Sequence, residues 1–270
     1  MVLSFIFLML SILASIGLYC GLELYRQWQY CFIFIGTIPG FYGVAFLLYV
    51  LFLFLFTLTL NKKRKIEKPS RFYWQLIRQS CHQMIFFANI KVHVSGLEKL
   101  PQTPFLIVSN HTSMFDPMVI LDQLKHQPLS CVTKPENEKI ILCGPLIHRA
   151  GFIPIDRNNA FHAIHSIQRA SKYISDFKTC IYICPEGTRS KTGKLLPFHP
   201  GSFKIATRME SDIVIASIKN ANLVKKNFPF RRTHIYLDIL EVLSHSDYQN
   251  KNTIELATMT QAIIEENLKR

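Results

Sequence analysis

Ionised side chains are almost missing from the first 60 of the 270 residues, where only Glu23 and Arg26 carry a formal charge. Soluble domains place many charged side chains on their surface, so this composition excludes an ordinary soluble domain for the stretch. The two charges cancel, and the whole net charge of +13 therefore belongs to residues 61–270. The chain is predicted to have a membrane-associated front part and a basic globular part, whose charge attracts polyanions such as anionic lipid.

Several common catalytic and metal-binding motifs are also missing. The sequence has no G-x-S-x-G turn, no H-E-x-x-H helix and no C-x-x-C pair, so it gives no support to a serine nucleophile or a zinc site of those types. The seven cysteines are odd in number and stand in apolar surroundings. This usage is typical of reduced, structural thiols in a protein that faces the cytosol.

Two apolar runs near the start are long enough to cross a bilayer. At ~1.5 Å per residue, a helix over Val2 to Leu22 spans a hydrocarbon core of ~30 Å. A secretory signal peptide is the alternative, but no positive residue precedes this run. A second helix is predicted over about Phe41 to Leu60, entered through a kink at the Pro39-Gly40 pair. We therefore expect an N-terminal membrane helical hairpin over residues 1–60.

A basic cluster, Lys62-Lys-Arg-Lys65, follows the second run directly. Such a cluster marks the cytoplasmic end of a membrane helix and attracts anionic headgroups, and a plain stop-transfer signal predicts the same topology. We therefore expect the cytoplasmic (inner) membrane, with the globular domain facing the cytoplasm. Residues 69–90 mix aromatic, apolar and basic residues at helical spacing, which fits an interfacial helix and a buried core helix equally. The predicted division is 1–60, membrane helices; 61–90, basic linker and interfacial amphipathic helix; and 91–270, globular domain.

Short apolar runs alternate with helical patterns in the globular part. Strands are predicted at 91–96, 105–108, 130–133, 151–157, 180–184, 213–218 and 233–242, and helices at about 117–124, 137–143, 144–150, 160–177, 202–209 and 253–268. This alternation predicts an α/β fold with a mixed, largely parallel sheet flanked by helices. In such folds ligands bind at the carboxyl ends of the strands.

His111 and Asp116 are the first candidates for chemistry, because they lie just beyond the buried run Phe105 to Val108. Pro117 places a helix start near Asp116, while His111 precedes it in a polar loop. If the loop folds back, Asp116 can accept a hydrogen bond from one ring nitrogen of His111, which leaves the other free to take a proton from a hydroxyl. The same spacing also fits a simple helix-capping arrangement, so the pair alone leaves both interpretations open.

Three further polar clusters each follow a predicted strand: Lys134, Asp156-Arg157 and Glu186-Gly187-Thr188-Arg189. Each cluster also has the composition of an ordinary solvent-exposed turn. Arg157 and Arg189 can hold a phosphate in bidentate fashion, and Lys134 can add a point charge. Gly187 lets a backbone N–H approach an anion, and Glu186 can orient an arginine or accept a substrate hydroxyl. Beside His111, the clusters describe an alcohol-activating base next to a phosphate clamp.

Four segments, in this order, resemble the motifs of the glycerolipid acyltransferase family: Asn110–Asp116, Gly151–Arg157, Pro185–Ser190 and Phe198–Gly201. The resemblance covers about residues 85–220, which is most of the globular domain. The sequence departs from the family pattern at Ile213-Val-Ile-Ala216, which has alanine where the family's fourth motif has proline. That departure bears on the acyl donor or the pocket shape more than on catalysis.

The resemblance implies transfer of a fatty acyl chain from acyl carrier protein or coenzyme A to the sn-2 hydroxyl of lysophosphatidic acid, which gives phosphatidic acid in phospholipid biosynthesis. It implies His111 as the base, Asp116 as its orienting partner, and these substrate contacts: Arg157, Glu186, Gly187, Thr188 and Arg189. The residue pattern adds Lys134 to these contacts. A thioester donor is already activated, so no metal and no bound cofactor is expected. Three alternatives stay open: another lyso-lipid or glycerol 3-phosphate as acceptor, a membrane lipid-binding protein without turnover, and a nucleic-acid-binding domain, for which the sequence has no recognisable motif.

Overall fold

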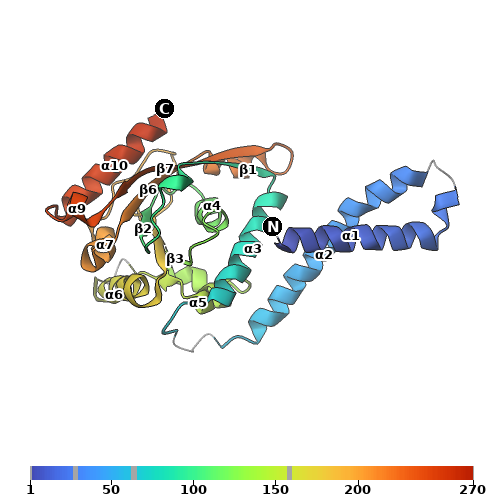
Figure 1. Ribbon diagram of the computed structural model, residues 1–270, viewed down its shortest axis with the longest axis horizontal. Helices are drawn as coiled ribbons and strands as arrows, with labels where there is room; N and C mark the ends of the chain where they lie inside the picture. The colour runs from blue at the N-terminus through green and yellow to red at the C-terminus, as the bar shows by residue number, and fades with distance from the viewer. Residues whose placement is uncertain (1, 27–29, 62–65, 157–159, 270) are drawn as a thin grey trace.

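The computed structural model describes residues 2–26, 30–61, 66–156 and 160–269. A helical hairpin extends from one end of an α/β domain (Figure 1). The basic cluster Lys62–Lys65 lies outside the described residues. The predicted combination of an α/β domain with an N-terminal helical hairpin is thus confirmed.

The hairpin consists of α1 (Val2–Gly21) and α2 (Cys31–Leu58). Both helices are long and apolar enough to cross a membrane, by length and composition. Thr37 Oγ1 donates to Ser15 Oγ at 3.0 Å and joins the two helices. The predicted start of the second helix near Phe41 was wrong, because α2 begins ten residues earlier and continues through Pro39. Proline removes only one backbone hydrogen bond, whereas ending the helix within an apolar run would leave several backbone groups unpaired.

The domain is built on a seven-stranded sheet in the order β1-β7-β6-β2-β5-β3-β4. The strands are β1 (Ile90–Ser95), β2 (Leu106–Val108), β3 (Leu129–Thr133), β4 (Ile153–Pro154), β5 (Cys180–Ile183), β6 (Ile213–Lys219) and β7 (Thr233–Leu243). Strands β2 to β6 run parallel to one another, whereas β7 is antiparallel to β6 and β1 is parallel to β7. The predicted mixed, largely parallel sheet is therefore confirmed.

This topology defines one edge of the sheet, which we call the carboxyl edge. The carboxyl ends of β2, β3, β4, β5 and β6 meet there, together with the first residues of β7 and β1, which run the opposite way. Loops that follow β2, β3, β4 and β5 therefore share this edge. The predicted polar clusters can come together only if these loops do. Residues 220–232, which connect β6 to β7, lie on this edge as well.

Helices cover both faces of the sheet. One face carries α3 (Arg71–Phe87), α4 (Phe115–Gln123), α5 (Gly144–Ala150) and the short α8 (Val224–Asn227); the other carries α6 (Ala160–Phe177), α7 (Lys204–Met209), α9 (His245–Tyr248) and α10 (Thr253–Lys269). The predicted helix at 137–143 is instead a 3-10 turn at Pro135–Lys139, with Pro135 at its start. Proline favours a helix start there, but the turn ends after five residues, before an α-helical segment forms.

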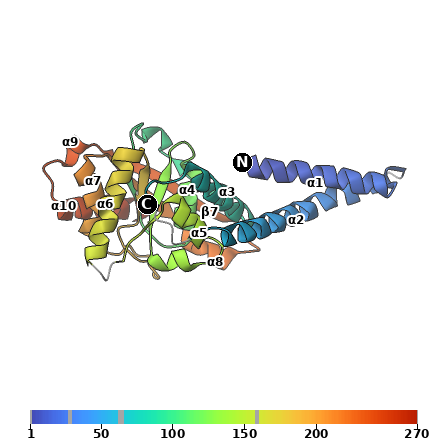
Figure 2. The same cartoon turned by 90° about the horizontal axis from the view of Figure 1, so that it is seen from below.

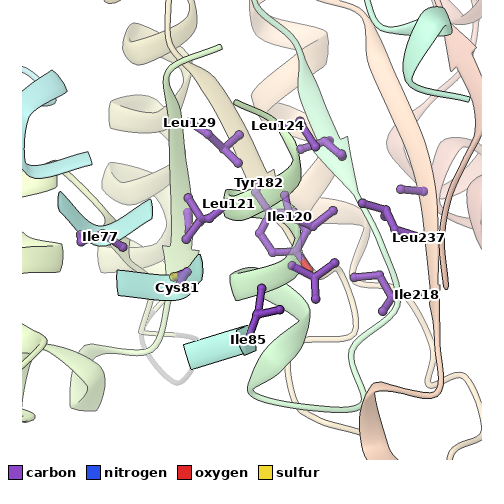
Figure 3. Packing of buried hydrophobic residues seen from close by; sticks show 14 of the residues in the cluster. Ile77, Cys81, Ile85, Ile120, Leu121, Leu124, Leu129, Tyr182, Ile218 and Leu237 are labelled. Carbon is purple, nitrogen blue, oxygen red and sulfur yellow. The ribbon is translucent and has the colours of Figure 1, made fainter. Parts of the chain in front are cut away.

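Strand β2 lies at the centre of the core because side chains on both of its faces are buried. Phe105 and Ile107 contact the layer that contains α4, and Leu106 and Val108 contact the layer that contains α6. All four are fully buried, which explains their continuous apolar run. In the first layer, Ile120 and Leu121 of α4 pack between the sheet and α3, as Figure 3 shows. The strand that leads to His111 is therefore firmly held.

Helix α3 packs on two sides. Trp74, Ile77, Cys81 and Ile85 are buried in the core against α4 and α5. Its other side meets the hairpin, where Gln83 Nε2 donates to Ser4 Oγ at 2.8 Å and Tyr42 Oη donates to Gln83 Oε1 at 3.1 Å. Of the two interpretations left open by the sequence, this packing supports a core helix, while exposed Phe72 and Phe86 keep an apolar surface free beside the hairpin.

Candidate active site

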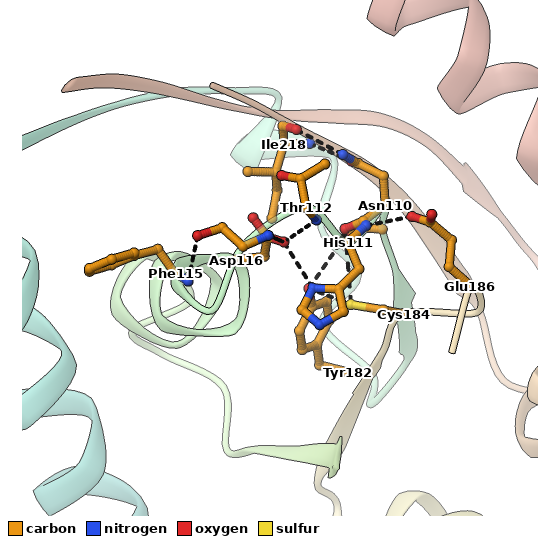
Figure 4. Close-up of polar contacts among 11 residues, drawn as sticks. Asn110, His111, Thr112, Phe115, Asp116, Tyr182, Cys184, Glu186 and Ile218 are labelled. Atoms are coloured by element: carbon orange, nitrogen blue, oxygen red, sulfur yellow. Dashed lines mark hydrogen bonds and ion pairs between the residues drawn. The ribbon is translucent and has the colours of Figure 1, made fainter. Parts of the chain in front are cut away.

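His111 and Asp116 form a hydrogen-bonded pair at the carboxyl edge. Strand β2 ends at Val108, and the following loop folds back so that His111 Nδ1 lies 2.9 Å from Asp116 Oδ2 (Figure 4). Asp116 belongs to the first turn of α4 and is fully buried, whereas 21% of the His111 side chain remains exposed. This is the loop geometry on which the predicted pairing depended. With Nδ1 facing Asp116, the second ring nitrogen, Nε2, is the one that can face a hydroxyl group.

The Asp116 carboxylate also fixes the backbone of the loop. Its Oδ2 accepts hydrogen bonds from the backbone N–H of Thr112 at 2.7 Å and of Ser113 at 2.8 Å. The carboxylate lies in the first turn of α4, at the positive end of the helix dipole. One carboxylate thus fastens the loop and orients the imidazole, which is the arrangement that the base interpretation requires.

The surroundings of His111 favour its protonated form. Burial lowers the pKa of the imidazole, but the hydrogen bond and charge of Asp116 and the adjacent Cys184 thiol outweigh that effect and raise the pKa to about 10. The pair therefore rests as an ion pair at neutral pH. An imidazole with a high pKa is a strong base in the fraction that is neutral.

Glu186 joins the loop after β2 to the loop after β5. Its Oε1 accepts the backbone N–H of His111 at 2.5 Å, and its Oε2 accepts the backbone N–H of Leu196 at 2.9 Å. In return, the backbone N–H of Ser190 donates to the His111 carbonyl at 2.8 Å. Burial raises the pKa of Glu186, and the two backbone donors oppose that shift. The carboxylate thus holds the backbone of His111 in place, a role that the sequence did not indicate.

Asn110 and Tyr182 are two further residues of the site that the sequence analysis did not assign. Asn110 is buried and pairs with Ile218 of β6 twice, donating to its carbonyl at 2.9 Å and accepting from its N–H at 2.8 Å. The Tyr182 hydroxyl bonds Ser109 Oγ at 2.9 Å and Cys184 Sγ at 3.0 Å. The sequence feature that could have identified Asn110 is its position between a buried strand and His111. Tyr182 carried no signal beyond being a large polar residue within a buried strand.

The remaining predicted contacts lie on the same edge of the sheet. Lys134 follows β3, while Thr188 and Arg189 follow β5, and all three are exposed. Among the described residues, neither the Lys134 ammonium nor the Arg189 guanidinium has a carboxylate within 4.0 Å. Gly187 adopts a φ of 77°, which a side chain would strain, and its N–H donates to the Cys184 carbonyl at 3.1 Å. Arg157 lies outside the described residues.

A cavity of about 660 Å³ opens at the opposite edge of the sheet, where Pro104 and Pro128 precede β2 and β3. It is therefore separate from His111. Within the described ranges, no group of three or more His, Cys, Asp or Glu side chains is arranged to hold a metal ion.

Comparison with known proteins relates most of the globular part to a family. Residues 91–219 match the family model described as Acyltransferase. The 1-acyl-sn-glycerol-3-phosphate acyltransferase of Saccharomyces cerevisiae is 26% identical over 208 residues, which cover 76% of this chain and 68% of that protein. The enzyme of the same name from Limnanthes douglasii is 30% identical over 150 residues, 55% of this chain and 52% of that protein. The alpha enzyme of Mus musculus is 30% identical over 132 residues, 48% and 45% respectively. The chain thus spans about half the length of these last two relatives.

A solved structure agrees with the fold. The 1-acyl-sn-glycerophosphate (LPA) acyltransferase PlsC from Thermotoga maritima superposes with a TM-score of 0.62 at 20% sequence identity, over 82% of this chain and 88% of that one. At this identity the likeness concerns the fold alone. The family match over residues 91–219 and the curated relatives agree: the globular part of this chain is similar to the acyltransferases, among them enzymes named 1-acyl-sn-glycerol-3-phosphate acyltransferase.

Proposed function

We propose that this chain transfers a fatty acyl chain to the sn-2 hydroxyl of lysophosphatidic acid and so forms phosphatidic acid. The observation that carries the proposal is the His111–Asp116 pair, with Nδ1 bound to a buried carboxylate and the histidine partly exposed at the carboxyl edge. Binding alone needs no such base. Relatives named 1-acyl-sn-glycerol-3-phosphate acyltransferase support this acceptor.

The transfer follows from the atoms that are free. His111 Nδ1 faces Asp116, so Nε2 takes the proton of the acceptor hydroxyl. The hydroxyl oxygen forms a bond to the thioester carbonyl carbon, and the tetrahedral intermediate then breaks its carbon–sulfur bond. The departing thiolate, from coenzyme A or acyl carrier protein, receives the proton from His111. The donor is a co-substrate, and the step needs no further cofactor.

Basic side chains on the same edge supply a site for the acceptor phosphate. Arg189 and Lys134 are exposed beyond β5 and β3, and we assign them to the phosphate together with Arg157. Thr188 and Gly187 belong to the same turn and contribute a hydroxyl and a tight backbone bend. Glu186 positions His111 and completes this turn rather than carrying a proton.

Replacing Arg189 tests the phosphate assignment. Arg189→Ala is expected to raise the KM for lysophosphatidic acid by about tenfold, the loss of one charge-assisted contact, with a smaller change in kcat. Steady-state kinetics with the acceptor varied at saturating donor measure this. Arg208→Ala is the matched control, because Arg208 is exposed at the end of α7, at the opposite edge of the sheet. An unchanged KM in Arg189→Ala would remove this residue from the clamp.

The activity itself is tested with the purified full chain and a panel of acceptors. Lysophosphatidic acid, other lyso-lipids and glycerol 3-phosphate are each offered with an acyl-coenzyme A and an acyl carrier protein thioester. Transfer to lysophosphatidic acid above the other acceptors is the expected result. Preference for another acceptor would show that the proposed substrate is wrong. If neither donor supports transfer, the result would favour a lipid-binding protein without turnover.

We also propose that the hairpin holds the domain at the cytoplasmic face of the inner membrane. Its two apolar helices and the basic cluster Lys62–Lys65 support this placement. The substrate and product are membrane lipids, so a membrane position brings the carboxyl edge to its acceptor.

A further inference from the structure

Two phenylalanines are exposed in the loop between α8 and β7. Phe228 is 53% exposed and Phe230 is 93% exposed, on either side of Pro229. We call residues 228–230 the Phe-Pro-Phe turn. The turn is held at its base, since the Arg231 N–H donates to the Asn227 carbonyl at 2.8 Å and Asn227 Nδ2 donates to Thr233 Oγ1 at 3.1 Å. The two rings are therefore presented outward by a fixed backbone.

Basic side chains surround these rings. Lys225 and Lys226 precede the turn, Arg231 and Arg232 follow it, and all four are exposed. The sequence from 213 to 237 contains no Asp or Glu. An apolar tip within a basic collar is the composition of segments that lie in the interface of an anionic bilayer, where rings enter the headgroup layer and cations meet phosphates.

The Phe-Pro-Phe turn lies on the carboxyl edge, as His111 does, because β7 begins there at Thr233. Arg232 Nε donates to Asn89 Oδ1 at 3.1 Å, which ties the loop to the end of α3. Phe86, near that end, is also 59% exposed. Both views place this loop at the side of the domain from which the hairpin extends (Figures 1 and 2). The turn thus lies on the same side of the domain as the hairpin.

We propose that the Phe-Pro-Phe turn is a second membrane-contact element, which inserts Phe228 and Phe230 into an anionic bilayer while the surrounding basic residues bind headgroup phosphates. The inference rests on the membrane placement proposed above for the hairpin. A lipid surface suits the site better than an acidic protein, because the turn lies on the side of the domain from which two helices long enough to cross a membrane extend. Contact at this edge sets the distance from His111 to the lipid that supplies the acceptor.

The test is a tryptophan reporter in the full chain reconstituted into vesicles. The chain has Trp28 and Trp74, so the emission of the wild type is subtracted from that of Phe230→Trp. In vesicles of phosphatidylglycerol and phosphatidylcholine, we expect the added emission to be blue-shifted and quenched by lipids brominated at shallow acyl positions. Ile254→Trp is the matched control, since Ile254 is 65% exposed at the start of α10, far from the hairpin, and its emission is expected to stay unquenched.

A reporter in the hairpin separates the two proposals. Leu13→Trp, at a position of α1 that is 59% exposed, is expected to be quenched by deeply brominated lipids. Quenching of Leu13→Trp without quenching of Phe230→Trp would overturn this inference and keep the membrane placement. If neither is quenched, the placement and the inference both fail. A Phe230→Trp emission that changes only when acyl carrier protein is added would identify an acidic protein as the partner and would overturn the lipid assignment.

The basic collar is tested by lipid charge. Shallow quenching of Phe230→Trp is expected to weaken in vesicles of phosphatidylcholine alone, and also in anionic vesicles when Lys226→Gln and Arg231→Gln are added together. Both changes remove attraction between the collar and headgroup phosphates. Equal quenching under all three conditions would rule out headgroup binding by these residues.

Discussion

His111→Ala is expected to lower kcat for acyl transfer by about 10²- to 10⁴-fold, the range that general-base catalysis contributes. The imidazole is the group that takes the hydroxyl proton, and water cannot replace it in the same geometry. The side chain is partly exposed and packs no core, so the variant is expected to stay folded in membranes. Initial rates with lysophosphatidic acid and each thioester donor measure the loss.

The chain contains its own control for this substitution. His82 Nδ1 lies 2.9 Å from Asp122 Oδ1, and Asp122 is almost fully buried, so α3 and α4 share a second histidine–aspartate pair. Position 82 lies on α3, outside the loops of the carboxyl edge. His82→Ala is expected to retain most of the activity. Normal turnover by His111→Ala, or equal losses in the two variants, would contradict the role of His111 as base.

Asp116→Ala is expected to reduce turnover about as strongly as His111→Ala, by about 10²-fold or more. The substitution removes the acceptor for His111 Nδ1 and for the N–H groups of Thr112 and Ser113. Leaving such groups unsatisfied costs about 1–3 kcal/mol each, so the loop is expected to lose its fold-back geometry. Kinetics, together with a denaturation curve of the same sample, separate lost catalysis from lost stability.

Asp116→Asn isolates the charge from the geometry. The two backbone donors require an oxygen at this position, so the amide oxygen of asparagine is expected to face them and still accept from His111. Activity needs the neutral imidazole, whose pKa is raised to about 10, so kcat/KM of the wild type is expected to rise from about pH 7 to about pH 9. Without the negative charge of Asp116 the pKa of His111 falls, and the rise levels off at lower pH. A profile that does not move would exclude Asp116 as the cause of the shift.

The sequence predicted the fold class and the pairing of His111 with Asp116, but not the contacts that join distant segments around them. His111 and Asp116 were recognisable because an apolar strand, a polar loop and a proline-marked helix start are all local signals. The hydrogen bond from His111 N–H to Glu186 and the pairing of Asn110 with Ile218 join segments 75 and 108 residues apart. Such contacts depend on which strands become neighbours in the sheet, and local sequence patterns do not specify that order.

For the membrane-proximal part, the sequence predicted which helices form but not where α2 begins. Apolar length identified both hairpin helices, but Pro39 suggested a boundary that the continuous backbone of α2 overrides. For α3, the mixed spacing of aromatic and basic residues was ambiguous for a physical reason. The helix is buried on one side by α4 and α5 and bonded on another to the hairpin, so neither a core pattern nor an interfacial pattern appears in pure form.

The hydrogen bonds that hold the loop from Ser109 to Asp116 limit the number of residues that this loop can contain. Asn110 is hydrogen-bonded to β6, His111 to Glu186 and Ser190, and Asp116 to the backbone of the loop itself. An inserted residue would break one or more of these hydrogen bonds. The stretch from Lys191 to Lys194 is exposed, and a Cβ at Gly193 would have only Asn222 Nδ2 within 4 Å, at 4.0 Å, apart from its chain neighbours. Insertions are therefore expected to be tolerated in this second loop and not in the first, so the spacing between His111 and Asp116 stays fixed while the length of the exposed loop beside them can vary.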